Sequence, residues 1–222
     1  MRRWDVWVIC VALSGVGVGL TLSAMIGQLD VPWASVAATA TLWLGMMVAI
    51  VFAFTRGRPA GVITFRPVDL LWGASAGLGL RLFQGWSSGA SVSAFPHIAT
   101  LDGGLPSGWW LTTAVPTVLV APVVEELFFR VVILIAVYQI FRRSVGPVSA
   151  GVTALLTSAG GFVLLHAPSG LPTLIDALGL FAVGSVCAVI VLLTGRVWGA
   201  VIAHVVYNAT YIVLVLLGTY LQ

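Results

Sequence analysis

The sequence predicts an all-α fold, a polytopic transmembrane helical bundle of about seven spans. Of its 222 residues, 60% are hydrophobic and only 8% are charged, whereas a soluble domain carries roughly a quarter charged residues. Apolar runs of about 18 residues or more, each long enough to cross a bilayer, recur along the whole chain. The pI of about 9.3 would suit a nucleic-acid-binding protein, but the sequence has no basic run and no basic–aromatic interleaving. We therefore expect no soluble domain and no nucleic-acid partner.

The predicted spans follow from the apolar runs and from the turn residues between them. The first run follows Arg2 and Arg3 and so has the basic flank of a signal peptide. It is longer than the apolar region of an ordinary signal peptide, and other spans follow it, so we expect an uncleaved first span. The spans are predicted at residues 6–26, 33–54, 68–86, 109–141, 148–166, 174–194 and 197–217.

The fourth predicted span is too long for a straight helix across a bilayer. Its 33 residues would make about 50 Å of α-helix, which exceeds the apolar thickness of about 30 Å. We therefore expect this span to tilt or to kink, with Pro116 and Pro122 as the kink sites. The connection before it, residues 87–107, is rich in Gly and Ser and contains Pro96 and Pro106, which is typical of a surface loop.

All ten basic residues are arginines, and their distribution predicts the orientation of the chain. Eight of them lie before the first span or in alternate connections: Arg2, Arg3, Arg56, Arg58, Arg66, Arg142, Arg143 and Arg196. The other connections hold Asp30, Asp102 and Asp176 and no arginine. Because cytoplasmic loops carry the excess of basic residues, we expect the N-terminus in the cytoplasm and, with seven spans, the C-terminus outside. Nothing signals a eukaryotic endomembrane protein, so we expect a bacterial cell membrane.

A charged stretch interrupts the fourth span. The sequence APVVEELFFRVVIL places Glu125, Glu126 and Arg130 among apolar residues, where an ionisable side chain is costly unless it is paired or meets water. Glu126 and Arg130 are four residues apart with the glutamate first, the favoured order for a helical ion pair. Glu125 is rotated by about 100° on the helix and cannot share that pair equally. One carboxylate is therefore predicted to be structural and the other free, although a purely structural role for both stays open.

Two further pairs of residues have the same spacing on later spans. His204 and Asn208, in AVIAHVVYNATY, project from one face of the last span, whereas Phe162 and His166, in GGFVLLHAPSG, place an imidazole over an aromatic ring. With a glutamate they offer a carboxylate, two imidazoles and an amide on three helices, and bundle cores build sites from facing helices in this way. Each of these polar residues also has a simpler interpretation than a role in a site. A histidine could form a hydrogen bond to a backbone carbonyl, and an asparagine could form a hydrogen bond that joins two helices.

Three other polar or reactive residues within the spans are expected to serve packing. Arg81, in the third span, has no evident carboxylate partner and is interpreted as structural or as snorkelling toward the interface. Cys10 and Cys187 lie inside apolar runs and are interpreted as small hydrophobic residues. They indicate neither a disulfide framework nor a cysteine-based metal site.

The three motifs together resemble a known family. E-E-x-x-x-R at 125–130, F-x-x-x-H at 162–166 and H-x-x-x-N at 204–208 occur in this order on successive hydrophobic segments. This pattern resembles the CPBP family of intramembrane proteases, the CAAX-processing and bacteriocin-processing enzymes also called the Abi family. The resemblance covers about 109–217, which we interpret as a catalytic helical core that follows variable transmembrane segments and an outer loop in 1–108. One departure is Val131, because the family often has glycine after the motif arginine.

The resemblance implies a membrane-embedded endopeptidase that hydrolyses a peptide bond in a peptide or a membrane-proximal substrate. It assigns Glu125 as the carboxylate that activates water with help from His166, and His204 and Asn208 as the groups that stabilise the oxyanion. The other motif residues would organise the site: Glu126, Arg130 and Phe162. Such a set supplies a base for water, donors for the oxyanion and a proton for the leaving amine without a nucleophilic Ser or Cys.

A metal-dependent mechanism is the main variant of this hypothesis. Glu125, His166 and His204 make a plausible catalytic zinc set with a position left for water. The sequence has no H-E-x-x-H, however, and the three candidate ligands lie on separate helices. We therefore favour a mechanism without a cofactor and keep zinc as the alternative. Two other classes stay open, a catalytically silent membrane scaffold or regulator of the same fold and a small transporter with a proton relay, although no inverted repeat is evident.

The depth of the motif residues in the bilayer sets a condition on the fold. Counted at about 1.5 Å per residue from the cytoplasmic ends of the spans, His166 lies near 28 Å and His204 nearer to 10 Å. The two imidazoles can meet only if the fifth span tilts or breaks, and Gly160–Gly161 is the expected break. The connection APSGLP would then dip into the protein and line a wet cavity.

Overall fold

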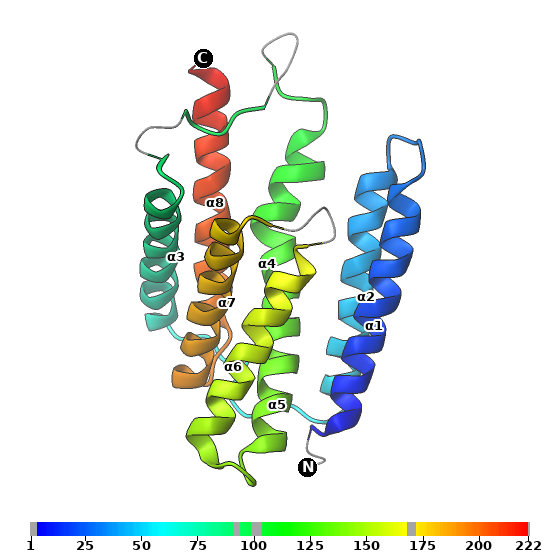
Figure 1. Ribbon diagram of the computed structural model, residues 1–222, viewed down its shortest axis with the longest axis vertical. Helices are drawn as coiled ribbons and strands as arrows, with labels where there is room; N and C mark the ends of the chain where they lie inside the picture. Colours follow the sequence, from blue (N-terminus) through cyan, green and yellow to red (C-terminus); the bar gives the residue numbers. More distant parts are fainter. Residues whose placement is uncertain (1–3, 91–93, 99–103, 168–171, 222) are drawn as a thin grey trace.

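The computed structural model describes residues 4–90, 94–98, 104–167 and 172–221. Within these ranges the chain forms helices and no strands, so the predicted all-α fold is confirmed. Figure 1 shows the helices packed lengthwise into a bundle, with the start of α1 and the end of α8 at opposite ends. The α4–α5 segment lies between the α1–α2 pair on one side and α3, α7 and α8 on the other.

Most helix boundaries agree closely with those predicted from the apolar runs. For six of the seven predicted spans, each end lies within three residues of the corresponding observed end. These helices are α1 (Val6–Gly27), α2 (Ala34–Arg56), α3 (Val68–Ser87), α6 (Gly146–Leu165), α7 (Leu174–Thr194) and α8 (Trp198–Tyr220).

The fourth predicted span is a chain of short helical pieces rather than one regular α-helix. Three of its pieces are π-helical, with hydrogen bonds from each carbonyl to the N–H five residues later. In order, the pieces are η2 (Trp110–Ala114), η3 (Pro116–Val120), α4 (Ala121–Glu126), η4 (Leu127–Ile133) and α5 (Leu134–Phe141). Pro116 is the first residue of η3 and Pro122 is the second residue of α4, so the two prolines predicted to disturb this span lie at the start of one of its wide turns and just beyond its end.

In the part of the chain that the structure describes, five helices are long and apolar enough to cross a membrane, namely α1, α2, α6, α7 and α8. The chain is therefore an integral membrane protein. The third predicted span, α3, carries the charged residues Asp69 and Arg81 within its 20 residues, and no piece of the fourth exceeds eight residues. The predicted number of seven spans is not confirmed and stays a prediction.

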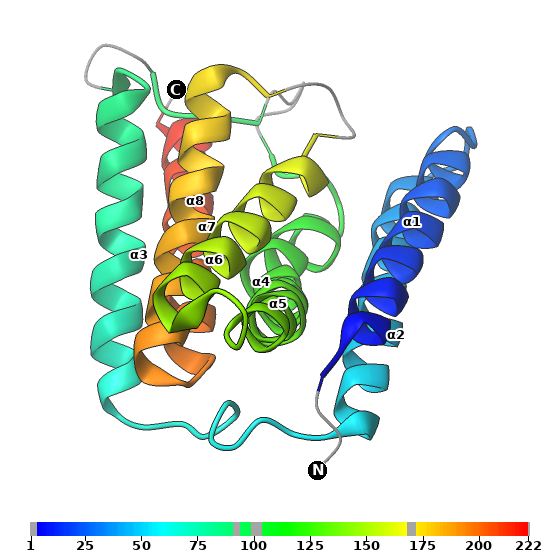
Figure 2. The same ribbon diagram turned by 60° about the horizontal axis from the view of Figure 1, so that its bottom comes forward.

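The depth of His166 required the fifth predicted span, which is α6, to tilt or to break. The helix is tilted and does not break. It continues without interruption past Gly160 and Gly161 to Leu165, so the break expected there is wrong. Figure 2 shows α6 crossing the bundle obliquely relative to α3, α7 and α8. The connection after α6 was expected to dip into the protein. This expectation concerns residues 168–171, which lie outside the described residues.

The connections that carry arginines lie together at one end of the bundle. The α2–α3, α5–α6 and α7–α8 connections are all at the lower end in Figure 1. Two ion pairs tie this end together, Arg56 to Asp5 at 2.9 Å and Arg196 to Asp69 at 2.7 Å. The assignment of this end to the cytoplasm stays a prediction.

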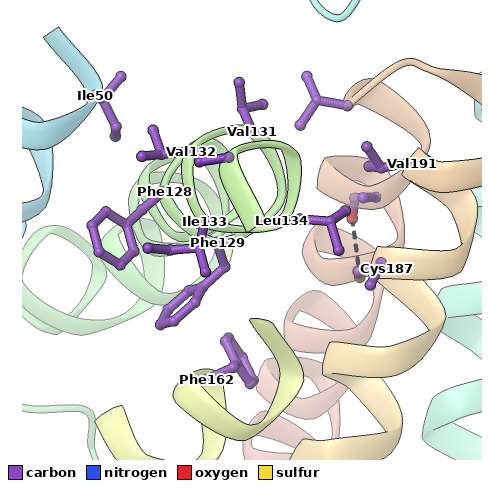
Figure 3. Packing of buried hydrophobic residues seen from close by; sticks show 14 of the residues in the cluster. Ile50, Phe128, Phe129, Val131, Val132, Ile133, Leu134, Phe162, Cys187 and Val191 are labelled. Atoms are coloured by element: carbon purple, nitrogen blue, oxygen red, sulfur yellow. Dashed lines mark hydrogen bonds between the residues drawn. The ribbon is translucent and has the colours of Figure 1, made fainter. Parts of the chain in front are cut away.

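The core is built around the segment that carries the charged motif. Figure 3 shows Phe128 and Val132 of η4 directed toward Ile50 of α2, whereas Leu134 is directed toward Cys187 of α7. Val131, where the family often has glycine, is fully buried in this cluster. The η4 piece and the two glutamates before it are therefore enclosed by helices from both halves of the chain, which surrounds the charged side chains with protein and keeps them from lipid.

Candidate active site

The two motif glutamates lie where α4 gives way to the π-helical η4. Glu125 and Glu126 are the last residues of α4, and Arg130 belongs to η4. All three are buried, with Glu126 and Arg130 completely inaccessible and Glu125 8% exposed. The charged stretch therefore faces the interior of the bundle, as an ionisable residue within a membrane segment is expected to do.

Glu126 is held by two partners. Its Oε2 lies 3.0 Å from Arg130 Nε, and its Oε1 accepts a hydrogen bond from His204 Nδ1 at 2.9 Å. The arginine contact is an ion pair without hydrogen-bond alignment, since neither Nε nor Oε2 has a hydrogen-bond partner among the described residues. Arg130 Nη2 donates to the Gly184 carbonyl at 3.4 Å, and its guanidinium lies 4.8 Å from the centre of the Phe162 ring. Glu126 thus connects η4 to α8.

His204 lies between the two glutamates. Its Nδ1 contacts Glu126, and its Nε2 lies 3.9 Å from Glu125 Oε2. Because the Glu126 carboxylate accepts, the Nδ1 of His204 carries the hydrogen and the Nε2 of the neutral ring presents a lone pair toward Glu125. A carboxylate that fixes the tautomer and orientation of a histidine in this way is a recurring arrangement at catalytic sites.

His166 approaches the same place from the end of α6. Its Nδ1 donates to the Phe162 carbonyl at 2.8 Å, which leaves Nε2 as the acceptor of the neutral ring. The Phe162 ring contacts both imidazoles, with centroid distances of 4.5 Å to His166 and 5.6 Å to His204. Glu125 lies 3.9 Å from His204. The structure thus brings the two histidines against Phe162 and Glu125 opposite one of them, with His166 itself exposed.

Asn208 lies at a different level from the glutamates. Its Nδ2 donates to the backbone carbonyl of Thr117 in η3 at 2.8 Å. Among the described residues, no hydrogen bond joins the Asn208 side chain to Glu125, His166 or His204. The oxyanion role that the resemblance assigns to Asn208 stays a prediction.

Three residues near the site were not singled out as functional from the sequence. Ser158, fully buried on α6, donates to the carbonyl of Phe129 at 3.0 Å. Gly184 accepts from Arg130, and the buried Cys187 interacts with the Glu126–Arg130 pair. Ser158 could have been found, because it lies four residues before Phe162 on the face that continues to the motif histidine. The other two carry no sequence signal of this kind.

A metal site is not formed by the described side chains as they stand. Within the described ranges, no group of three His, Cys, Asp or Glu residues lies close enough to hold a metal ion. Glu125, His166 and His204 have the donor types for zinc, and both histidines present Nε2, but they are not gathered as a ligand set. The mechanism without a metal stays a prediction.

The match to a known family covers the segment that builds this site. Residues 107–210 match the Rce1-like family, described as type II CAAX prenyl endopeptidase Rce1-like. No curated protein and no solved structure shows a significant match to the chain. The matched segment contains all three motifs, and with the helical bundle it indicates a membrane protease of the CAAX type. Residues 107–210 are thus similar to the Rce1-like family, which confirms the resemblance inferred from the motifs.

Proposed function

We propose that the protein is a membrane-embedded endopeptidase in which Glu125 activates a water molecule for attack on a peptide bond. The position of Glu125 opposite His204 carries this proposal, because their facing atoms are 3.9 Å apart. This distance is too long for a direct hydrogen bond, but a water molecule with hydrogen bonds of about 2.8 Å can bridge it. Glu126 does not share this position, since both its oxygens already contact Arg130 and His204.

The proposed reaction follows the usual course of peptide hydrolysis. Glu125 takes a proton from the bridging water as its oxygen attacks the carbonyl carbon. His204, which takes a proton on Nε2 from solvent before the attack and keeps it throughout, donates a hydrogen bond to the oxyanion of the tetrahedral intermediate, and Glu126 stabilises its positive charge. The C–N bond then breaks as the proton on Glu125 passes to the leaving nitrogen. The products are a new carboxylate and a new amine, and His166 supports Glu125 electrostatically.

An apolar groove beside the site suits a hydrophobic substrate. It lies between α1 and the η4 and α6 elements, and its volume is about 390 Å³. Phe129 and Gly161 line it, and Phe129 packs edge-on against Phe162, whose ring touches both histidines. The substrates that we propose are therefore peptides or membrane-proximal segments with an apolar character, within the lipid bilayer.

A comparison of peptides in living cells tests the proposed function. We expect cells that produce the wild-type protein to release or accumulate cleavage products absent from cells that produce Glu125→Gln, when secreted and membrane peptides are compared by mass spectrometry. Equal production of both proteins in the membrane fraction is the control. Identical peptide profiles, with any phenotype of the wild type kept by Glu125→Gln, would instead support a catalytically silent scaffold.

Removal of divalent metals separates the two mechanisms. We expect purified protein to keep its cleavage activity after treatment with a chelator, because Glu125 and the histidines suffice to activate water. The measurement is the rate of cleavage of a peptide found in the cellular comparison, before and after chelation. If the activity were lost on chelation and fully recovered on addition of zinc, Glu125, His166 and His204 would have to be interpreted as metal ligands.

A further inference from the structure

The backbone of η3 leaves one carbonyl without a partner in the helix. In a π-helix each carbonyl accepts from the N–H five residues later, and Ala121 accordingly donates its N–H to the carbonyl of Pro116. The next donor in this ladder would belong to residue 122. Pro122 has no N–H, so the Thr117 carbonyl has no donor in the π-helical register.

A side chain from another helix supplies the missing donor. Asn208 of α8 places Nδ2 at 2.8 Å from the Thr117 oxygen. An unsatisfied backbone carbonyl in a protein interior is costly, because it has lost its water partner without replacement. The amide of Asn208 thus fills the position in the ladder that Pro122 leaves empty.

The same face of α8 carries the histidine of the site. His204 lies one turn before Asn208 and contacts both glutamates, Glu126 at 2.9 Å and Glu125 at 3.9 Å. The α8 helix is therefore attached to the fourth segment at two levels, once at the glutamates and once at Thr117. A rotation or a slide of α8 that moved His204 away from Glu125 would also break the bond at Thr117.

We infer that Asn208 is a positioning residue, whose amide replaces the N–H that Pro122 cannot supply and thereby sets the distance between His204 and Glu125. Its effect on catalysis rests on the proposed function, but its bond to the backbone does not. This role is separate from the oxyanion role implied by the family resemblance, because it uses the N–H that binds Thr117 and leaves the second N–H of the amide for a substrate. The effects of substitutions at Pro122 and Asn208 should therefore depend on each other. If a substitution at position 122 restores the backbone N–H, the Asn208 amide is no longer needed as the donor to the Thr117 carbonyl.

Four proteins test the coupling: the wild type, Asn208→Ala, Pro122→Ala and the double variant. We expect Asn208→Ala to lower the unfolding midpoint of the detergent-solubilised protein and to reduce kcat about tenfold with little change in KM, as the loss of one half-buried hydrogen bond predicts. In the Pro122→Ala background the same change should alter kcat by no more than about twofold and leave the midpoint nearly constant. Pro122→Val, which also restores the N–H and better conserves the side-chain volume, is made in parallel in case Pro122→Ala does not accumulate.

Pro116→Ala is the matched control, since it restores an N–H in the same segment but not in register with Thr117. Asn208→Ala must keep its full effect in that background. Equal losses of kcat and midpoint from Asn208→Ala with and without Pro122 would overturn the inference. A loss of kcat in both backgrounds with no change in the midpoint would also overturn it and place Asn208 on the substrate. The midpoints are measured without a substrate, so they decide the coupling even if no peptide is cleaved.

Discussion

Glu125→Gln is expected to abolish peptide cleavage and to leave the folded protein almost unchanged. Glutamine keeps the shape of the side chain and can still form a hydrogen bond, but it cannot take a proton from water. General-base catalysis contributes about 10²–10⁴-fold to a rate, and a loss in kcat of that size should be seen with purified protein. The unfolding midpoint should stay close to that of the wild type, since the contact of Glu125 with His204 is as long as 3.9 Å and the close pair with Arg130 belongs to Glu126.

Two further variants sharpen this test. Glu125→Asp keeps the base but withdraws it by one methylene, so it should retain a measurable fraction of the activity. Asp30→Asn changes an exposed carboxylate in the α1–α2 connection and should have no effect. Wild-type kcat in Glu125→Gln would show that this carboxylate is not the base and would direct the same test to Glu126.

Arg130→Ala is expected to impair folding as well as cleavage. Arg130 is fully buried, pairs with Glu126 at 3.0 Å and packs over the Phe162 ring. Its loss leaves His204 as the remaining partner of the Glu126 carboxylate, and breaking a buried ion pair costs about 3–5 kcal/mol. This approaches the whole stability of many domains. We expect little folded protein in the membrane fraction, measured by size-exclusion chromatography after solubilisation, and a lower unfolding midpoint.

The comparison variants separate the charge from the contacts. Glu126→Gln should be milder than Arg130→Ala, because its amide oxygen can still accept from the guanidinium. Arg130→Lys keeps the charge but not the planar group over Phe162 or the reach to the Gly184 carbonyl, and should be intermediate. Arg143→Ala, at an exposed position, is the control. If Arg130→Ala accumulated and unfolded like the wild type, the buried pair would not be what holds η4 to α8.

Hydropathy and helical spacing predicted the structural features that depend on residues close together in the sequence. The six spans that agree with helices are continuous apolar runs, and their ends are set by Pro, Gly and charged residues that sequence reading detects. The ion pair of Glu126 with Arg130 and the contact of Phe162 with His166 also follow from four-residue spacing. Because η4 is π-helical, however, the motif lies at a change of helical period that no hydrophobic pattern marks.

Contacts between helices were not predictable in the same way. The tilt of α6 depends on close packing of small residues, such as Gly184 against Ala159 and Gly161 against Phe129, which one sequence does not place together. The depth estimate for His166 assumed upright helices and so separated two histidines that share a contact with one phenylalanine ring. The bond between Asn208 and Thr117 likewise depends on the register of one helix against another.

The position of His204 between two carboxylates also determines how a change at one carboxylate affects the other. The Nδ1 of the imidazole contacts Glu126, and its Nε2 faces Glu125. One rigid ring therefore joins the two carboxylates, and neither can move without moving the ring. A substitution at Glu126, which we place away from the substrate, would thus displace the imidazole that faces the proposed base.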